Sequence, residues 1–242
     1  MRPRAQRGNG RAGITVGLTV ALFGASGLVG GECLAALLDD GRFERVRAVV
    51  RRPLPAALRP TGAAADRLEE RVLDLERLGE HDALAGVDRV ICAIGTTMRR
   101  AGSRDAFRRV DYELPLEIAR LALARAVPHY LLVSAIGADV GSRFFYNRVK
   151  GELEDALLAL PFRATTILRP ALLLGPRAEL RPAELAGKAL GWLLPGRLRP
   201  VRASDVARVL AEQAAADRAG SRIIESEEIR ALARAARREG DR

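Results

Sequence analysis

Short runs of apolar residues alternate with stretches of helical hydrophobic periodicity along most of the chain. Each apolar run has the length of one strand, and the stretches between the runs repeat apolar residues at three- and four-residue spacing. Because strands and helices alternate, the pattern predicts a parallel sheet with helices on both faces, an α/β fold. The expected strands cover residues 15–23, 45–50, 69–73, 88–94, 129–134 and 164–169, and the expected helices cover 28–39, 104–126 and 143–159.

The pattern changes in two places. The stretch 53–65 is rich in proline and alanine and is expected to be a loop. After Pro170 the alternation stops, and Leu180–Leu194 has the pattern of an amphipathic helix.

A glycine-rich turn follows the first apolar run, and a helical pattern begins within it. Glycines allow a tight turn and let backbone N–H groups approach the phosphates of a dinucleotide, while the N-terminus of the next helix favours negative charge. The turn therefore predicts a dinucleotide site, and a glycine turn without a ligand is the alternative. It consists of Gly24, Ala25, Ser26, Gly27, Leu28, Val29 and Gly30.

Two arginines, Arg51 and Arg52, follow the second expected strand. An NAD site usually has an acidic residue at this position to bind the ribose hydroxyls, whereas arginine accommodates the extra 2′-phosphate of NADP. The pair therefore favours NADP(H) over NAD(H). Arginine is common throughout the chain, so a plain composition bias is the alternative.

Lysine is rare in this chain, because only Lys150 and Lys188 among its 40 basic residues are lysines. Tyr146 precedes Lys150 by four residues, so both side chains share one face of the expected helix. A nearby ammonium favours the phenolate and lowers the pKa of a tyrosine, which suits a general acid/base. Ser134, at the end of its strand, is expected to hydrogen-bond the reacting oxygen, because ligands bind at the carboxyl ends of parallel strands. A surface tyrosine–lysine pair, with the serine in a turn, is the alternative.

In combination, these motifs resemble the short-chain dehydrogenase/reductase superfamily. More narrowly, they are similar to its atypical branch of small NAD(P)H-binding proteins, which includes the Tat-interacting oxidoreductase-like group. The resemblance implies a Rossmann-like doubly wound parallel sheet. It also implies that the segment 200–207 returns to the sheet and starts a further helix, which Ser204 or Asp205 can cap. It extends over residues 18–235 and depends on the order of the glycine turn and the segments 92–97, 101–103, 107–111, 134–139, 146–152 and 168–170.

The resemblance implies a role for each matching residue. The three glycines of the turn would hold the pyrophosphate, the two arginines would bind the 2′-phosphate, and Tyr146 would be the acid/base. Two positions depart from the pattern, because Asp111 replaces a common asparagine and Ala135 replaces the second residue of a serine pair. These departures weaken the expectation of catalytic turnover more than the expectation of cofactor binding. The remaining implied cofactor contacts are Asp74 near adenine, Gly95 and Thr96 along the middle of the cofactor, Lys150 at the nicotinamide ribose, and Pro170 beside the nicotinamide.

Composition excludes several other classes of protein. Two cysteines and two histidines, far apart in sequence, predict neither a disulfide framework nor a metal site. The net charge of +10 includes four arginines within the first 11 residues, and ten aromatic residues (six Phe, three Tyr, one Trp) are too few for a nucleic-acid stacking platform. Nucleic acid is therefore not the expected partner.

The early chain also has the outline of a targeting segment, because 20 uncharged residues, 12–31, follow a basic start. They contain six glycines and the predicted dinucleotide turn, so cleavage there would destroy the nucleotide site. We therefore expect a cytoplasmic protein without a membrane span.

We accordingly divide the chain into a disordered basic tail (1–13), an NAD(P)-binding Rossmann domain (14–170) and a small C-terminal substrate region (171–242) integrated with the same fold. The expected function is that of an NAD(P)H-dependent oxidoreductase acting on a small carbonyl or alcohol substrate. A non-catalytic NADPH-binding regulatory or partner-binding protein is one alternative, and an NAD-retaining epimerase or dehydratase is another. Homodimerisation through the outer helices stays open.

Overall fold

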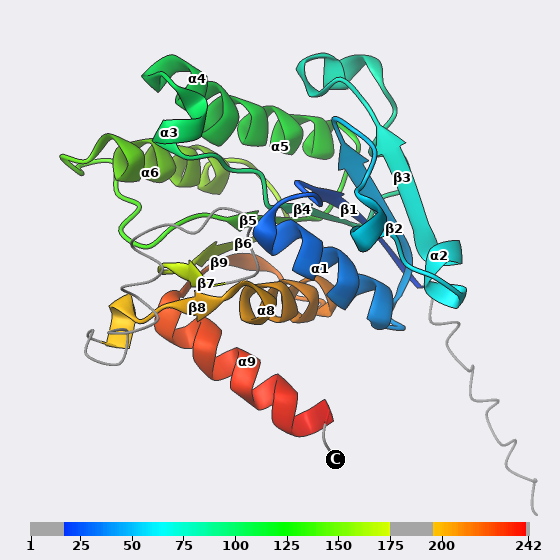
Figure 1. The fold of residues 1–242 in the computed structure, drawn as a ribbon. Helices are drawn as coiled ribbons and strands as arrows, with labels where there is room; N and C mark the ends of the chain where they lie inside the picture. Colours follow the sequence, from blue (N-terminus) through cyan, green and yellow to red (C-terminus); the bar gives the residue numbers. More distant parts are fainter. Residues whose placement is uncertain (1–16, 175–195, 241–242) are drawn as a thin grey trace, which may run out of the picture.

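The computed structural model describes residues 17–174 and 196–240 (Figure 1). Its main sheet has seven strands in the order β3-β2-β1-β4-β5-β6-β9, and each neighbouring pair is parallel. This confirms the predicted doubly wound sheet. The strands are β1 (Leu18–Phe23), β2 (Phe43–Val50), β3 (Leu68–Val72), β4 (Arg89–Cys92), β5 (His129–Val133), β6 (Ala164–Arg169) and β9 (Gly220–Glu225).

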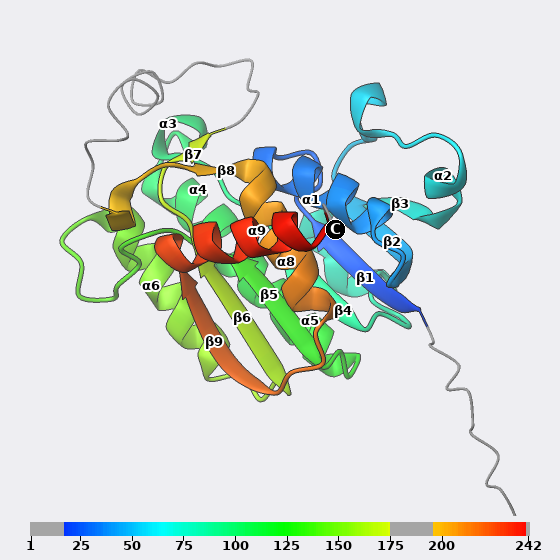
Figure 2. The same ribbon diagram turned by 90° about the horizontal axis from the view of Figure 1, so that it is seen from below.

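Helices cover both faces of the sheet (Figures 1 and 2). One face carries α1 (Leu28–Asp39), α8 (Ala203–Ala215) and α9 (Ser226–Gly240), with α8 packed between the other two. The opposite face carries α5 (Leu114–Ala124) and α6 (Phe145–Leu158). The sheet is therefore shielded from water on both sides, as parallel sheets require.

The alternation of side chains along each strand divides the core into two layers. In β1, Val20 and Leu22 pack in the layer under α1 and α8, whereas Ala21 and Phe23 pack in the layer under α5 and α6. Successive strand residues point to opposite faces, so both sets are apolar and the run appears continuous in the sequence. All four residues are fully buried, and burial of a side chain such as Phe23 contributes about 2 kcal/mol.

The helix predicted over 104–126 is interrupted. It begins as α4 (Arg104–Arg108), continues as a π-helical segment η3 (Arg109–Glu113), and resumes as α5. The N–H of Leu114 donates to the carbonyl of Arg109, five residues back, and Pro115 at the start of α5 has no N–H to donate. The proline therefore breaks the regular hydrogen-bond ladder here, and a π-bulge of this kind is often found at a functional site.

Other predictions need correction. Within the expected loop 53–65, the structure has a 3-10 turn η1 (Ala56–Leu58) and the start of a short helix α2 (Ala63–Arg67). Strand β9 was not predicted, because its sequence is largely polar at an exposed edge. Helix α9 (Ser226–Gly240) was not predicted either. Further short elements are η2 (Leu75–Glu80), α3 (Met98–Ala101), η4 (Gly196–Leu198) and the two-stranded pair β7 (Leu173–Leu174) with β8 (Val201–Arg202).

The cap predicted for the helix after residue 200 is also wrong. Arg202 occupies the N-cap of α8, without a side-chain capping bond from any described residue. Asp205 lies inside the first turn and forms an ion pair with Arg237 of α9 at 2.7 Å instead. The predicted tail 1–13 and the helix predicted over 180–194 lie outside the described residues. Among the described helices, none combines the length and apolarity needed to cross a bilayer.

Candidate functional site

The glycine turn is held in close contact with the end of β4. Gly24 directly follows β1 and has a φ of +85°, a conformation that favours glycine. A Cβ atom on Gly24 would lie 2.8 Å from the carbonyl of Ala93. A Cβ atom on Gly30 would lie 2.0 Å from the carbonyl oxygen of Gly24, so α1 packs directly on the turn. Both positions therefore require glycine for steric reasons.

The N-terminus of α1 is open to an anion. Gly27 occupies its N-cap and donates its own N–H to the carbonyl of Gly24 at 2.8 Å. The first turn of α1 contains no acidic residue. Ser26 and Gly27 are exposed, whereas Ala25 and Val29 are buried in the packing beneath. Free N–H groups and the helix dipole make this end suitable for a phosphate.

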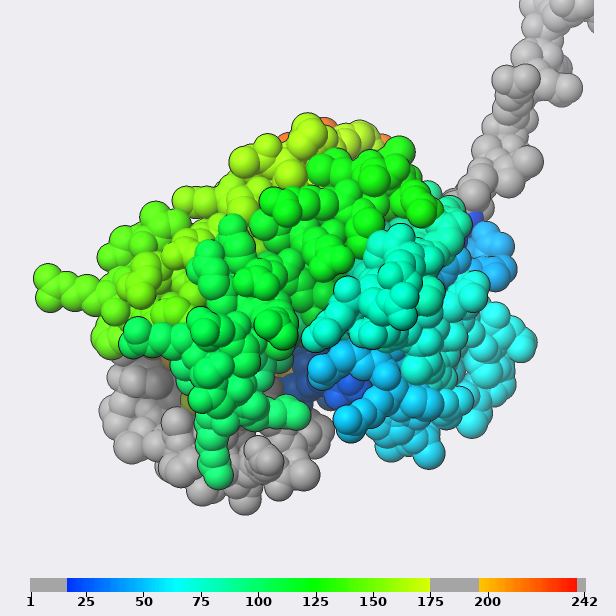
Figure 3. All heavy atoms as spheres, turned by 90° about the horizontal axis from the view of Figure 1, so that it is seen from above, coloured from blue at the N-terminus to red at the C-terminus, as the bar shows by residue number. Residues whose placement is uncertain are grey.

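The turn lies where the strand order reverses. From β1 the chain builds outward through β2 and β3 on one side, and β4, β5, β6 and β9 extend the sheet on the other side. In such sheets, ligands bind outside the carboxyl ends of the strands at this switch point. Seen from above, deep-blue atoms of the early chain lie in a recess between light-blue and green segments (Figure 3). Gly95 and Thr96 follow β4 at the same edge.

Three more predicted cofactor residues lie at this edge of the sheet. Arg51 and Arg52 directly follow β2 and are exposed. Asp74 is also exposed, and its carboxylate accepts a hydrogen bond from the N–H of Glu76 at 3.0 Å, which caps η2. Part of its hydrogen-bonding capacity therefore serves the turn itself.

Tyr146 and Lys150 lie one turn apart on α6, as predicted. The ring of Tyr146 is half-buried and packs on Phe107, with 5.5 Å between the ring centroids. The side chain of Lys150 is only 2% exposed, and its Nζ atom forms an ion pair with Oδ1 of Asp111 at 2.7 Å. The other carboxylate oxygen of Asp111 accepts a hydrogen bond from the N–H of Thr96 at 2.8 Å.

These contacts keep Lys150 charged. Burial by itself disfavours the ammonium, but attraction to Asp111 and to Tyr146 outweighs it and raises the pKa of Lys150 above its ordinary value. A charged ammonium near a tyrosine favours the phenolate, which suits a phenol that transfers a proton.

Ser134 has a different partner from the one expected. It is buried directly after β5, and its hydroxyl donates a hydrogen bond to the carboxylate of Glu154, which is 1% exposed on α6. Glu154 also accepts a hydrogen bond from Nε of Arg169, the last residue of β6, at 2.9 Å. Pro170 is buried next to this arginine, and its carbonyl accepts a hydrogen bond from Ile136 at 3.0 Å.

The partners of the predicted site residues were missed in the sequence. Asp111 stood out only as a departure from a pattern, and its pairing with Lys150 was not predicted. Glu154 was not singled out at all, although it lies four residues after Lys150 and therefore shares its helix face. That spacing is the one sequence signal that points to it.

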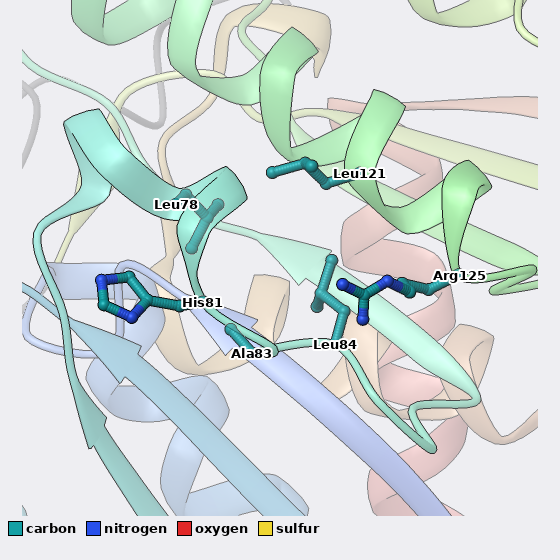
Figure 4. A pocket seen from close by; sticks show the side chains of 6 residues that line it. All are labelled: Leu78, His81, Ala83, Leu84, Leu121 and Arg125. Atoms are coloured by element: carbon teal, nitrogen blue, oxygen red, sulfur yellow. The ribbon is translucent and has the colours of Figure 1, made fainter.

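Two cavities lie away from this edge. The first has a volume of only about 10 Å³, which is space for about one water molecule. The second, of about 240 Å³, includes His129, Ala164 and Gly220, the first residues of β5, β6 and β9, and therefore lies at the amino edge of the sheet. The described residues contain no group of three or more metal-ligating side chains. The first cavity is lined by Leu78, His81, Ala83, Leu84, Leu121 and Arg125 (Figure 4).

Residues 24–217 match a family described as NAD(P)H-binding. HTATIP2 from Rattus norvegicus is 39% identical over 177 residues, which cover 72% of this chain and 71% of that protein. Protein fmp52 from Emericella nidulans is 38% identical over 172 residues, covering 70% and 72% of the two chains. FMP52 from Eremothecium gossypii is 34% identical over 224 residues, covering 89% and 97%.

A solved structure supports the fold. MoeE5, determined in complex with UDP-glucuronic acid and NAD, is similar with a TM-score of 0.67. The similarity covers 90% of this chain and 82% of that chain at 20% sequence identity. At this identity the likeness concerns the Rossmann-like architecture.

The relatives correct the expected cytoplasmic location. The fungal proteins from Emericella nidulans and Eremothecium gossypii are both named as mitochondrial. The expectation relied on the small number of cysteines and on the glycine turn within the uncharged early stretch. A low cysteine count does not separate one reducing compartment from another, so that expectation was wrong.

The glycine turn at the switch point, the family match and the HTATIP2 and Fmp52 relatives agree with one another. The chain therefore belongs to the NAD(P)H-binding family, as an atypical protein similar to short-chain dehydrogenases/reductases, with a Rossmann-like fold.

Proposed function

We propose that this protein is an NADPH-dependent oxidoreductase that interconverts a small carbonyl compound and its alcohol, with Tyr146 as the acid/base. The observation that carries the proposal is the shared helix face of Tyr146 and Lys150, with the buried ammonium ion-paired beside the loop that follows β4. A charged lysine in this position favours the phenolate of its neighbour.

The cofactor residues of the proposal surround the switch point. The turn Gly24–Gly30 and the N-terminus of α1 would hold the pyrophosphate, because their backbone permits close approach of an anion. Gly95 and Thr96 would contact the middle of the cofactor, and Pro170 its nicotinamide end. Asp74 would lie near the adenine. When bound, NADPH supplies the hydride for the reduction.

The chain's own residues handle the proton and the orientation. Tyr146 would donate a proton to the carbonyl oxygen during reduction and accept it back from the alcohol during oxidation. Lys150 would bind ribose hydroxyls and keep the phenol acidic. We do not extend the catalytic role to Ser134, because its hydroxyl proton is directed to Glu154. In the proposal this serine supports α6.

The preference for NADPH rests on Arg51 and Arg52. Both are exposed and directly follow the carboxyl end of β2. Fluorescence titration with NADPH and NADH tests it. We expect tighter binding of NADPH in the wild type and similar binding of both nucleotides in Arg51→Ala/Arg52→Ala.

Arg45→Ala is the matched control, because Arg45 is also exposed on β2 but lies near its amino end. It should leave the ratio of the two affinities unchanged. An unchanged ratio in the double variant would contradict the NADPH preference, and lack of saturable binding of either nucleotide would contradict the proposed function.

The turnover number kcat tests the acid/base role of Tyr146 directly. In a screen of small aldehydes, ketones and alcohols, Tyr146→Phe should lower kcat by about 100-fold or more while NADPH binding persists. Tyr112→Phe is the control, since Tyr112 packs its ring under Arg108, 4.3 Å from the guanidinium carbon, and phenylalanine keeps that contact. Equal kcat values for Tyr146→Phe and the wild type would rule out the acid/base role.

A further inference from the structure

The carboxylate of Asp111 connects two parts of the proposed site. One oxygen lies 2.7 Å from Nζ of Lys150, and the other accepts the N–H of Thr96 at 2.8 Å. The side chains of Asp111 and Lys150 are 1% and 2% exposed. Asp111 reaches both partners from the π-helical segment η3. Lysine, cofactor loop and helix are therefore joined at one buried residue.

The ion pair lies just beneath the exposed backbone of Gly95. A Cβ atom built on Gly95 would lie 3.4 Å from Oδ1 of Asp111 and 4.0 Å from Nζ of Lys150. Because Gly95 is exposed and has no side chain, only backbone atoms of this residue lie over the pair. A ligand bound on this loop would therefore lie close to both charged groups of the pair, and a change in either charge would affect its binding.

We propose that Asp111 is a positioning residue that fixes the protonated Lys150 and offsets its positive charge at the nicotinamide ring, so that the site accepts the oxidised, cationic form of the nicotinamide cofactor. The inference rests on the proposed function, which puts the nicotinamide end of NADP beside Lys150. The oxidised nicotinamide ring carries a positive charge and the reduced ring is neutral. An ammonium without a carboxylate would repel only the oxidised form.

Among the titratable groups near Lys150, Asp111 is the one that can offset its charge throughout turnover. The titratable groups that act on Lys150 are Asp111 from η3, Tyr146 from its own helix, and the thiol of Cys92 from β4. Burial raises the pKa of Cys92, so the thiol is neutral at physiological pH. Tyr146 is the acid/base itself and changes its charge during turnover in the proposed function. Asp111 is therefore the counter-charge that contacts the ammonium directly.

A set of charge variants tests the inference by the ratio of the dissociation constants for NADP⁺ and NADPH, measured by calorimetry. Wild type and Asp111→Asn/Lys150→Met both carry no net charge at the pair. Asp111→Asn leaves one positive charge, and Lys150→Met leaves one negative charge. We expect the ratio to rise on the order of tenfold in Asp111→Asn at pH 6, where its lysine is protonated, and to fall in Lys150→Met.

The double variant separates the effect of charge on this ratio from the effect of lost side-chain contacts. A loss of ribose contacts weakens both cofactor forms alike and cancels in the ratio, so the double variant should restore the wild-type ratio. The same ratio in wild type and Asp111→Asn would overturn the inference, and so would a change that persists in the double variant. Asp205→Asn is the control, because Asp205 is a buried aspartate that pairs with Arg237 at 2.7 Å, and it should leave the ratio unchanged.

A second readout needs no cofactor. The chain has two lysines, so ¹³C-lysine labelling in a Lys188→Arg background leaves one signal, that of Lys150. In the wild type, this signal should stay in its protonated position above the ordinary lysine pKa of about 10.4, and in Asp111→Asn it should titrate at lower pH. Identical titrations would overturn the inference. Absence of binding with different titrations would instead contradict the proposed function.

Discussion

The hydroxyl of Ser134 donates its hydrogen bond to Glu154, a buried carboxylate two helical turns beyond Tyr146 on α6. A hydroxyl has a single proton to donate. While it binds Glu154, Ser134 cannot donate to a substrate carbonyl. The serine thus connects the end of β5 to the helix that carries the tyrosine and the lysine.

Ser134→Ala should therefore affect folding more than chemistry. Loss of this buried hydrogen bond should lower the free energy of unfolding by about 1–2 kcal/mol, measured by urea denaturation. Its kcat should stay well above that of Tyr146→Phe. A kcat as low as that of Tyr146→Phe would assign Ser134 to the reacting oxygen after all.

Glu154 should contribute more to stability than any exposed carboxylate of this network. In Glu154→Ala, Arg169 and Ser134 both lose their buried partner, which should lower the free energy of unfolding by about 3 kcal/mol. Glu225 also pairs with Arg169, at 2.9 Å, but its side chain is 53% exposed. Glu225→Gln should lower it by less than about 1 kcal/mol in the same urea titration. Equal losses in the two variants would contradict the importance of burial.

Gly30→Ala should disrupt the glycine turn. Its added methyl group would lie 2.0 Å from the carbonyl oxygen of Gly24, so the turn or α1 must move. We expect a loss of about 3 kcal/mol in the free energy of unfolding and at least tenfold weaker NADPH binding. Gly41→Ala is the control, because no heavy atom beyond its own residue and its chain neighbours lies within 4 Å of its Cβ position. Unchanged NADPH affinity in Gly30→Ala would show that the turn does not bind the nucleotide.

His129 should make folding sensitive to mild acid. Burial, and then the charges of Arg89 and Arg163, lower the pKa of His129 to about 4. The unfolded state therefore takes up a proton near pH 6.5, before the folded state does. The stability present above pH 6.5 is lost as the pH falls towards 4, by up to about 3 kcal/mol.

Urea titrations between pH 7 and pH 4.5 measure this loss. The slope of stability against pH should flatten in His129→Gln, whose amide can still bond to Thr166, the partner of His129 at 2.9 Å. His81→Gln should keep the wild-type slope, because His81 is exposed. A wild-type slope in His129→Gln would show that other groups cause the acid sensitivity.

Sequence patterns were sufficient for most strands because both faces of the sheet are buried. β1 and β5 therefore appear as continuous apolar runs. They failed for β9, because an edge strand with exposed polar residues has no such run. They also failed for the helix over 104–126, where a proline changes the hydrogen-bond ladder without changing the apolar periodicity.

The sequence alone determined the alternation of strands and helices, the glycine turn and the shared helix face of Tyr146 and Lys150, because each depends on neighbouring residues and local backbone geometry. Only the tertiary structure decided which charges meet. Asp111 reaches Lys150, and Ser134 reaches Glu154, across separate elements that packing brings together. In an arginine-rich chain with many acids, charge pairing depends on distance and burial in three dimensions, and spacing along the chain does not reveal either.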